Sequence, residues 1–416
     1  MQKIDPEKVL LVAIETPKIT EFEINESLVE LERLVTTLGH EVIGCVSQRL
    51  PNTRGPTVVG EGKLLEIAQF KDLASLVVFD CDLRPSQVRN VEAALGIPVL
   101  DRTGVIIEIF SRHAKTRASQ LQVEIARQKY EAPRLREMGV GKEHHSGRGS
   151  GESGLEIEKR KIRDRLSDLK HELEAVQADE KNRRTGRSEQ LCVALVGYTN
   201  AGKSSLMRAL TGSDVLVEDK LFATLDTTVR ALQPETQPRI LVTDTVGFIH
   251  KLPHDLVASF RSTLDEARQA SLLLQVVDAS DPNFRSQLKV VRDVLCEIGA
   301  EKTPYYLLLN KTDCLNKVQK ESLKIDFPDA IMMSALSNED VQELRNRIIS
   351  FFEKDMVEEE ILVPYRAQAV IGEMRLNMKI LKENFEESGI RIRALSRPID
   401  LFRIKKSFLN QKVGRT

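Results

Sequence analysis

The sequence predicts a multi-domain α/β protein, and three patterns carry this prediction. Short apolar runs alternate with helical periodicity near the amino terminus and again in the second half of the chain, which is typical of strand–helix–strand units. A glycine-rich loop directly follows one apolar run, at residues 197–204. Two long stretches with helical spacing lie between these regions. The 416 residues, of which 41% are hydrophobic, suit roughly two to four domains with apolar cores.

Periodicity and breakers divide the chain into four expected domains. They are a small α/β domain at residues 1–108, a helical hairpin at 109–188, a P-loop domain at 189–355 and a small carboxyl-terminal domain at 356–416. Within the first domain we expect strands at residues 9–14, 42–46, 76–80 and 98–100, and helices at 27–38 and 86–95.

The hairpin is predicted from two amphipathic stretches. The first covers residues 121–130. The second has apolar residues at alternating spacings of four and three, which predicts a coiled-coil seam of Ile162, Leu166, Leu169, Leu173 and Val176. Residues 139–154 between them are rich in Gly, Ser and His, so we expect a flexible tip.

The loop at residues 197–204 reads G-x-x-x-x-G-K-S and predicts a nucleoside triphosphate site. Its glycines allow backbone N–H groups to curl around phosphates at the mouth of a helix. We expect Lys203 to reach the β- and γ-phosphates. Ser204 and the strand-end carboxylate of Asp244 are expected to hold Mg²⁺, and Gly247 to offer its N–H to the γ-phosphate.

Two later motifs at predicted strand ends indicate GTP rather than ATP. They are DTVG at residues 244–247 and NKTD at residues 310–313. Asp313 can accept hydrogen bonds from the N1–H and the exocyclic amine of guanine, a donor pair that adenine lacks. Asn310 is expected to bond the purine N7 edge, with the Lys311 stem along the base. The backbone N–H groups of residues 334–335 are expected to face guanine O6.

The expected site residues are the following. Nucleotide contacts are Gly197, Tyr198, Thr199, Asn200, Ala201, Gly202, Lys203, Ser204, Ser205, Phe222, Ala223, Thr224, Leu225, Asp226, Asp244, Thr245, Val246, Gly247, Asn310, Lys311, Thr312, Asp313, Ser334 and Ala335. Catalytic roles are expected for Asn200, Lys203, Thr224, Asp244 and Gly247, and Mg²⁺ ligation for Ser204, Thr224 and Asp244.

Composition disfavours several other classes of protein. No window has the unbroken apolar length of a membrane span, and the start has no apolar signal core, so we expect a cytoplasmic protein. The five cysteines are scattered and favour neither a disulfide framework nor a zinc site. Residues 111–188 and 361–416 carry more Lys and Arg than Asp and Glu. These segments indicate either solvated helix surfaces or contact with a polyanion.

The sequence outside the nucleotide motifs is also distinctive. Residues 222–226 read FATLD, and residues 244–267 read DTVGFIHKLPHDLVASFRSTLDEA. Upstream stand SQVRN at 86–90, VLDRTG at 99–104 and LQVEIA at 121–126. Together these segments resemble the HflX family of ribosome-associated GTPases in the Obg-like group, over nearly the whole chain up to about residue 355. The resemblance implies binding to the large ribosomal subunit and its RNA, and a part in splitting, recycling or rescuing ribosomes under stress.

Hydrolysis is expected to be slow without a partner. Many GTPases orient the attacking water with a glutamine after the motif glycine, but residue 248 is Phe, whose ring cannot make that hydrogen bond. Thr224 is the expected switch threonine, with Thr227 or Thr228 as the alternative. Asn200 is a candidate ligand for K⁺ beside the phosphates; alternatively it bonds its own loop backbone.

These observations predict a GTP-hydrolysing switch acting on the ribosome. The main alternative is a ribosome assembly or hibernation adaptor that binds RNA and uses GTP only as an occupancy signal. A metabolic P-loop kinase is disfavoured by the NKTD motif at residues 310–313. No DNA partner is expected.

Overall fold

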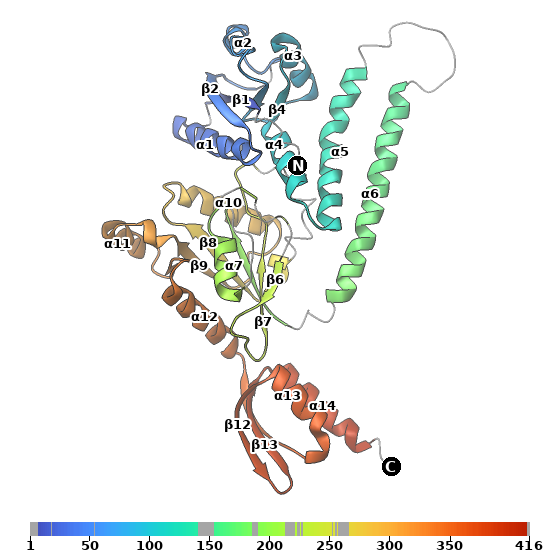
Figure 1. Ribbon diagram of the computed structural model, residues 1–416, viewed down its shortest axis with the longest axis vertical. Coiled ribbons are helices and arrows are strands. Elements are labelled where there is room, and N and C mark those ends of the chain that lie inside the picture. Colours follow the sequence, from blue (N-terminus) through green and yellow to red (C-terminus); the bar gives the residue numbers. More distant parts are fainter. Residues whose placement is uncertain are drawn as a thin grey trace. The chain divides into compact units, whose positions relative to one another are not determined.

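The computed structural model describes residues 7–17, 19–53, 55–139, 154–184, 190–212, 221–222, 225, 228–251, 253, 256 and 266–413 (Figure 1). The chain forms two compact units. The first comprises Met1–Arg184, Glu218–Asp226 and Ile249–Ser262, and the second comprises Thr185–Val217, Thr227–Phe248 and Thr263–Thr416. Two short segments, 218–226 and 249–262, therefore belong to the first unit although the sequence around them belongs to the second.

The first unit is built on a parallel sheet with the strand order β2-β1-β3-β4. Its strands are β1 (Lys8–Glu15), β2 (Glu41–Arg49), β3 (Leu76–Phe79) and β4 (Val99–Asp101). β1 pairs on both edges and is buried along almost its whole length. A strand covered on both faces needs a continuous apolar run, which is the pattern that predicted it.

Four helices cover this sheet. They are α1 (Glu21–Thr37), α2 (Glu61–Ala68), α3 (Pro85–Leu95) and α4 (Arg102–His113). α2 and α3 bury apolar residues against one face, while α1 and α4 contact each other over the other face (Figure 1). α1 starts six residues before the predicted start at 27, because Thr20 and Glu23 form a reciprocal capping box.

The predicted boundary at residue 108 falls inside α4. This helix starts after Asp101, whose carboxylate caps it by accepting from Gly104 N at 2.9 Å, and it runs on to His113. The apolar spacing of its buried residues continues across residue 108, so no break in the chain coincides with the predicted boundary.

Two long helices follow and form a hairpin, α5 (Arg117–Gly139) and α6 (Gly154–Arg184), which lie side by side (Figure 1). Leu169 of α6 is buried against Leu121 and Ile125 of α5. Three more of the predicted seam residues, Leu166, Leu173 and Val176, pack around this cluster. The predicted seam is thus confirmed over these residues, whereas residues 140–153 of the predicted tip lie outside the described residues.

The second unit contains a six-stranded sheet with the order β10-β9-β8-β5-β7-β6. Its strands are β5 (Leu191–Gly197), β6 (Thr228–Ala231), β7 (Ile240–Asp244), β8 (Leu272–Asp278), β9 (Tyr305–Asn310) and β10 (Ile331–Met332). β6 is antiparallel to β7, and the other pairs are parallel. The carboxyl ends of β5, β7 and β9 therefore lie at one edge of the sheet, where ligands bind in open α/β folds.

Helices cover both faces of this sheet. α7 (Lys203–Thr211) and α12 (Asn338–Glu353) share one apolar cluster with the central strands. α10 (Phe284–Glu297) and α11 (Lys317–Asp326) contribute to a second cluster with β8 and β9. A short 3-10 helix, η1 (Thr312–Cys314), directly follows β9.

The last part of the second unit is a three-stranded antiparallel sheet with the order β11-β13-β12. Its elements are β11 (Val357–Val363), η2 (Tyr365–Ala367), α13 (Gln368–Asn377), β12 (Lys379–Glu386), β13 (Gly389–Ser396) and α14 (Pro398–Val413). α13 and α14 pack on one face of the sheet through a separate apolar cluster. Across the described ranges, no helix combines the length and apolar character that crossing a membrane requires.

Candidate nucleotide site

The glycine-rich loop lies between β5 and α7 in the second unit. It starts at Gly197, the last residue of β5, and α7 begins at Lys203. Gly202 has a φ of 95°, which residues with a side chain rarely adopt, and a Cβ there would lie 2.2 Å from Asn310 Nδ2. A Cβ at Gly197 would lie 2.2 Å from the carbonyl oxygen of Val276. Close packing beneath the loop thus requires both glycines of the motif.

The buried Lys203 side chain donates to carbonyl groups of its own loop. Its Nζ lies 3.1 Å from Gly197 O and 2.8 Å from Tyr198 O. Burial lowers the pKa of Lys203 to about 8, although the nearby Asp244 carboxylate opposes the shift. Water solvates this ammonium poorly, so an anionic phosphate in the loop would stabilise its charge.

Ser204 and Asp244 come together at the carboxyl ends of β5 and β7. Ser204 Oγ donates to Asp244 Oδ2 at 3.0 Å, and Asp244 is fully buried. A hydroxyl and a carboxylate are the oxygen ligands that Mg²⁺ prefers, so these two side chains fit this ion. Among the described residues, no group of three or more His, Cys, Asp or Glu side chains is arranged to hold another metal.

Backbone hydrogen bonds tie the DTVG segment to the phosphate loop. Thr199 N donates to Phe248 O at 2.8 Å, and Phe248 N donates to Gly197 O at 3.1 Å. Phe248 is buried, so it anchors this segment. A Cβ at Gly247 would lie 2.8 Å from Thr199 Cγ2 and 3.1 Å from Lys203 Nζ. Gly247 therefore lies directly against the loop whose phosphate it is expected to contact.

Asn310 joins two loops at the end of β9. Its buried side chain donates from Nδ2 to Ala201 O and accepts at Oδ1 from Ala335 N, both at 2.9 Å. The Ala335 N–H, predicted to face guanine O6, thus donates to Asn310 instead. Ser334 N donates to the Asp340 carboxylate at 2.7 Å. Asn310 therefore holds the site together, and its predicted contact with the purine N7 edge stays a prediction.

Asp313 is exposed and ionised beside this junction. A hydrogen bond from the Ser334 side chain lowers the pKa of Asp313, and the Cys314 thiol, 3.5 Å from its Oδ2, acts in the same direction. Lys311 has a φ of 60°, and its Nζ pairs with Asp278 Oδ2 at 2.7 Å. The ion pair fixes the Lys311 stem at the strand end. The exposed Asp313 carboxylate has acceptor capacity beyond its bonds from Ser334 and Cys314, so it can accept hydrogen bonds from a base.

The other residues predicted to contact the nucleotide differ in their exposure to solvent. Tyr198, Thr199, Ala201, Thr245, Val246 and Thr312 are buried, and Ser205 is partly buried. Asn200 is exposed at a φ of 58°, a left-handed conformation that asparagine tolerates. Thr228, an alternative switch threonine, begins β6 and pairs in register with Asp244. Ala223, Thr224, Asp226 and Thr227 lie outside the described residues.

Phe222 and Leu225, predicted as nucleotide contacts, are both buried in the first unit. The Phe222 ring meets the Phe110 ring of α4 edge-on, with centroids 4.6 Å apart. The structure thus assigns the Phe222 side chain to an apolar contact with α4 rather than to the phosphate loop. The Phe222 ring is large and apolar, so burying it against α4 is more favourable than leaving it exposed beside a solvated nucleotide.

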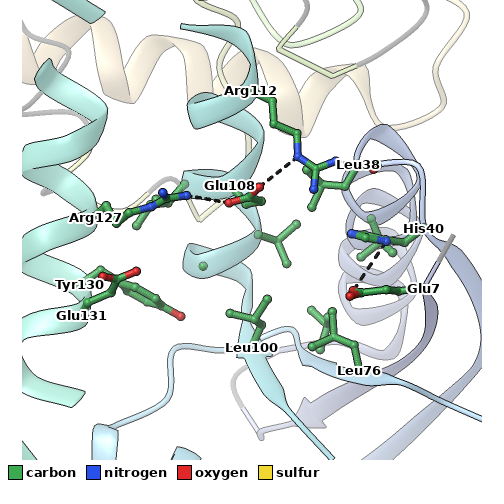
Figure 2. Close-up of a pocket in the computed structure, with 15 residues that line it drawn as sticks. Glu7, Leu38, His40, Leu76, Leu100, Glu108, Arg112, Arg127, Tyr130 and Glu131 are labelled. Carbon is green, nitrogen blue, oxygen red and sulfur yellow. Dashed lines mark hydrogen bonds and ion pairs between the residues drawn. The ribbon is translucent and has the colours of Figure 1, made fainter. Parts of the chain in front are cut away.

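The first unit also contains a cavity that no sequence motif indicates. It measures about 350 Å³ and is lined by residues of α1, α4, α5, β3 and β4 (Figure 2). On its wall Glu108 accepts from Arg112 at 3.0 Å and from Arg127 at 2.7 Å, and Glu7 faces His40 at 3.7 Å. Because Glu108 is already paired with two arginines and many of the other lining residues are apolar, the lining indicates no single class of ligand.

Family profiles match most of the chain. The profile described as "GTP-binding GTPase N-terminal" matches residues 25–111, and "GTP-binding GTPase Middle Region" matches residues 113–187. The profile described as "50S ribosome-binding GTPase" matches residues 192–311, which include the phosphate loop and DTVG.

Relatives match over nearly the full length. "GTPase HflX" of Gluconacetobacter diazotrophicus is 52% identical, over 96% of this chain and 97% of that protein. "GTPase HflX" of Caldanaerobacter subterraneus subsp. tengcongensis is 39% identical, over 94% of this chain and 91% of that protein. A solved structure described as the "SsGBP and GDP complex" is 26% identical, over 83% of this chain and 98% of its own, with a TM-score of 0.47.

Proposed function

Because the chain belongs to the HflX family of GTPases, we propose that its GTP hydrolysis drives a switch on the large ribosomal subunit. Its task would be to split, recycle or rescue ribosomes under stress. The observation that carries the proposal is the joining of the motif loops in one site. Ser204 bonds Asp244, Phe248 bonds the phosphate loop, and Asn310 bonds Ala201.

Within this site each group would act on a different part of the nucleotide. Lys203 would exchange its loop carbonyls for β- and γ-phosphate oxygens, and Gly247 N–H would bond the γ-phosphate. Ser204 and Asp244 would hold Mg²⁺, with Thr224 added in the GTP state. When bound, Mg²⁺ neutralises charge on the phosphate oxygens. The poorly solvated Lys203 ammonium supports this assignment, since phosphate binding would relieve its desolvation.

Guanine would be read at Asp313. Its lowered pKa and exposed position support a carboxylate that accepts from the N1–H and the exocyclic amine. Asn310, held between Ala201 and Ala335, would place this carboxylate relative to the phosphate loop. Specificity would then arise because adenine would leave the carboxylate without its donors.

Hydrolysis would be slow unless a partner assists. Phe248 is buried and hydrogen-bonded through its backbone to the phosphate loop, so its side chain is not available to orient water. Asn200 is an exposed residue of the phosphate loop and has a left-handed backbone conformation. It would act as a K⁺ ligand, with the cation neutralising charge that develops on the phosphates.

The large ribosomal subunit is the proposed partner. The matching profile over residues 192–311 is described as that of a ribosome-binding GTPase, and the sequence carries basic segments at 111–188 and 361–416. Lys and Arg in such segments would neutralise ribosomal RNA phosphates. A ribosomal partner is consistent with the expected cytoplasmic location.

Two measurements test this function. Hydrolysis of GTP is measured with purified large subunits, small subunits and neither, and the rate should rise only with the large subunit. Sedimentation then compares binding in the presence of a non-hydrolysable GTP analogue and of GDP, and the analogue should favour the complex. Fast hydrolysis that ribosomes do not change would contradict the proposal.

The alternative adaptor function gives the opposite result in the first measurement. An adaptor that uses GTP as an occupancy signal would bind large subunits in the presence of the analogue but would show negligible turnover even when saturated with them. The expected stimulation, roughly 10³- to 10⁵-fold where an arginine finger provides it, is large enough to separate the two functions.

A further inference from the structure

One hydroxyl of the phosphate loop is buried without a hydrogen-bond partner. Thr199 is 7% exposed, and its Oγ1 meets no donor or acceptor among the described residues. Two other hydroxyls of the site are bonded, since Ser204 Oγ donates to Asp244 and Thr245 Oγ1 donates to Leu195 O at 2.7 Å. A buried hydroxyl without a partner costs free energy, so its presence in a binding loop indicates a bond that a ligand completes.

The backbone N–H of Thr199 is already engaged. It donates to Phe248 O at 2.8 Å, and Phe248 N donates in turn to Gly197 O at 3.1 Å. In glycine-rich loops of this kind, backbone N–H groups are the usual contacts of the phosphates. Thr199 cannot offer this group without losing its bond to Phe248. Its side chain is therefore the part of the residue that can contact a ligand.

The Thr199 side chain lies against Gly247, at the end of the site where the γ-phosphate is expected. A Cβ at Gly247 would lie 2.8 Å from Thr199 Cγ2, 3.0 Å from Thr199 Cα and 3.1 Å from Lys203 Nζ. Threonine is branched at Cβ, so one carbon carries both this methyl group and the hydroxyl. The Thr199 side chain and the Lys203 ammonium therefore approach the same glycine, whose N–H is expected to bond the γ-phosphate.

An anionic oxygen is the partner that this position favours. The Lys203 ammonium donates to Gly197 O and Tyr198 O, so positive charge is present in the loop beside Thr199. A hydroxyl can donate one hydrogen bond, and bonds to charged acceptors are stronger than bonds to neutral ones. Because Thr199 Oγ1 is buried, a bond to a phosphate oxygen would not have to replace a bond to bulk water.

We propose that the Thr199 hydroxyl donates a hydrogen bond to an oxygen of the γ-phosphoryl group and so helps the protein to distinguish GTP from GDP. In hydrolysis, water forms a bond to the γ-phosphorus while the bond from that phosphorus to the β–γ bridging oxygen breaks. One proton of the water stays on the phosphate product and the other passes to solvent. Thr199 keeps its own proton throughout.

Loss of the phosphate removes the acceptor, so the Thr199 contact belongs to the GTP state alone. GDP would leave the hydroxyl unpaired, as it is in the structure described here. The inference rests on the proposed binding of GTP by this loop, but it does not depend on the ribosomal partner.

Thr199→Val tests the proposal, because valine keeps the branched shape and removes the hydroxyl. The ligands are GDP and a GTP analogue with an imido group in place of the β–γ bridging oxygen, and the protein is the full chain without ribosomes. We expect the affinity for the analogue to fall about tenfold, as for loss of one hydrogen bond to a charged group. GDP affinity should change by less than about twofold. kcat/KM for GTP should fall by about as much as the analogue affinity.

Three further variants separate loss of a ligand contact from damage to the loop. Thr199→Ser keeps the hydroxyl and should retain most of the preference for the analogue over GDP. Thr211→Val makes the same substitution at the end of α7, where the buried hydroxyl donates to Met207 O at 2.7 Å, and should leave that preference unchanged. Thr199→Ala repeats the comparison if the valine variant does not fold.

Thermal unfolding adds a readout that a purely structural role would move in the opposite direction. Thr199→Val removes no hydrogen bond of the described structure, so the nucleotide-free variant should melt no lower than the wild-type protein. A hydroxyl that stabilised the loop would instead lower the melting temperature when it is removed.

Two results would overturn the proposal. One is a ratio of analogue affinity to GDP affinity that Thr199→Val leaves unchanged or raises, including the case in which both affinities fall equally. The other is an equal loss of this ratio in Thr199→Ser, because the methyl group rather than the hydroxyl would then be responsible. Neither measurement involves ribosomes, so failure here would be distinct from failure of the proposed function.

Discussion

Replacing Asn310 by alanine should destabilise the second unit and also weaken nucleotide binding. The buried amide donates to Ala201 O and accepts from Ala335 N, both at 2.9 Å. Alanine leaves a carbonyl and an N–H without these partners. A buried polar group that loses its partner costs about 1–3 kcal/mol, which gives about 2–6 kcal/mol for the two. Ala335 is partly exposed and water can reach it, so the lower half of this range is expected.

Thermal unfolding checks this estimate. About 2–4 kcal/mol should lower the melting temperature by roughly 4–16 °C, since 1 kcal/mol corresponds to about 2–4 °C in a unit of this size. Asn338→Ala is the matched control, because Asn338 is an exposed residue of the same unit. The control should melt like the wild-type protein. An Asn310→Ala variant that also melts like wild type would refute the argument that Asn310 joins the loops.

Three further outcomes are expected. Asp313→Asn should lower the affinity for GTP by orders of magnitude and raise the affinity for xanthosine triphosphate, whose edge presents an acceptor where guanine has a donor. Retained GTP affinity would contradict recognition of guanine by this residue. Burial lowers the pKa of Lys203 to about 8, so the nucleotide-free protein loses this proton as the pH rises through about 8. Titration calorimetry should therefore show a GDP affinity that falls above this pH, because binding then requires Lys203 to take up a proton. Lys203→Arg, which stays charged, should show no such dependence. Hydrolysis should be faster in K⁺ than in Na⁺ at equal ionic strength, and Asn200→Ala should remove the difference while sparing GTP affinity; equal rates in the two salts for the wild-type protein would leave Asn200 with a structural role only.

The sequence by itself determined the fold class, the family and the order of the nucleotide motifs. Each of these features depends on residues that are close together in the sequence. The loop at residues 197–204 needs glycines where the backbone turns, and the strands before it and before NKTD are continuous apolar runs because both of their faces are covered. The hairpin seam was likewise readable, since the spacing of Leu166, Leu169 and Leu173 along one helix face does not depend on the rest of the chain.

Only the tertiary structure decided which partners these residues meet. Asn310 carries the sequence pattern of a base contact, yet its amide is held by Ala201 and Ala335, which are far from it in the chain. Lys251 and Asp80, which form an ion pair, are 171 residues apart, and no local pattern distinguishes either from an ordinary surface charge. Phe222, expected beside the nucleotide, is buried against α4. Hydrogen bonds, ion pairs and ring contacts between distant segments depend on how the elements pack, and packing is not encoded in the spacing of residues along one element.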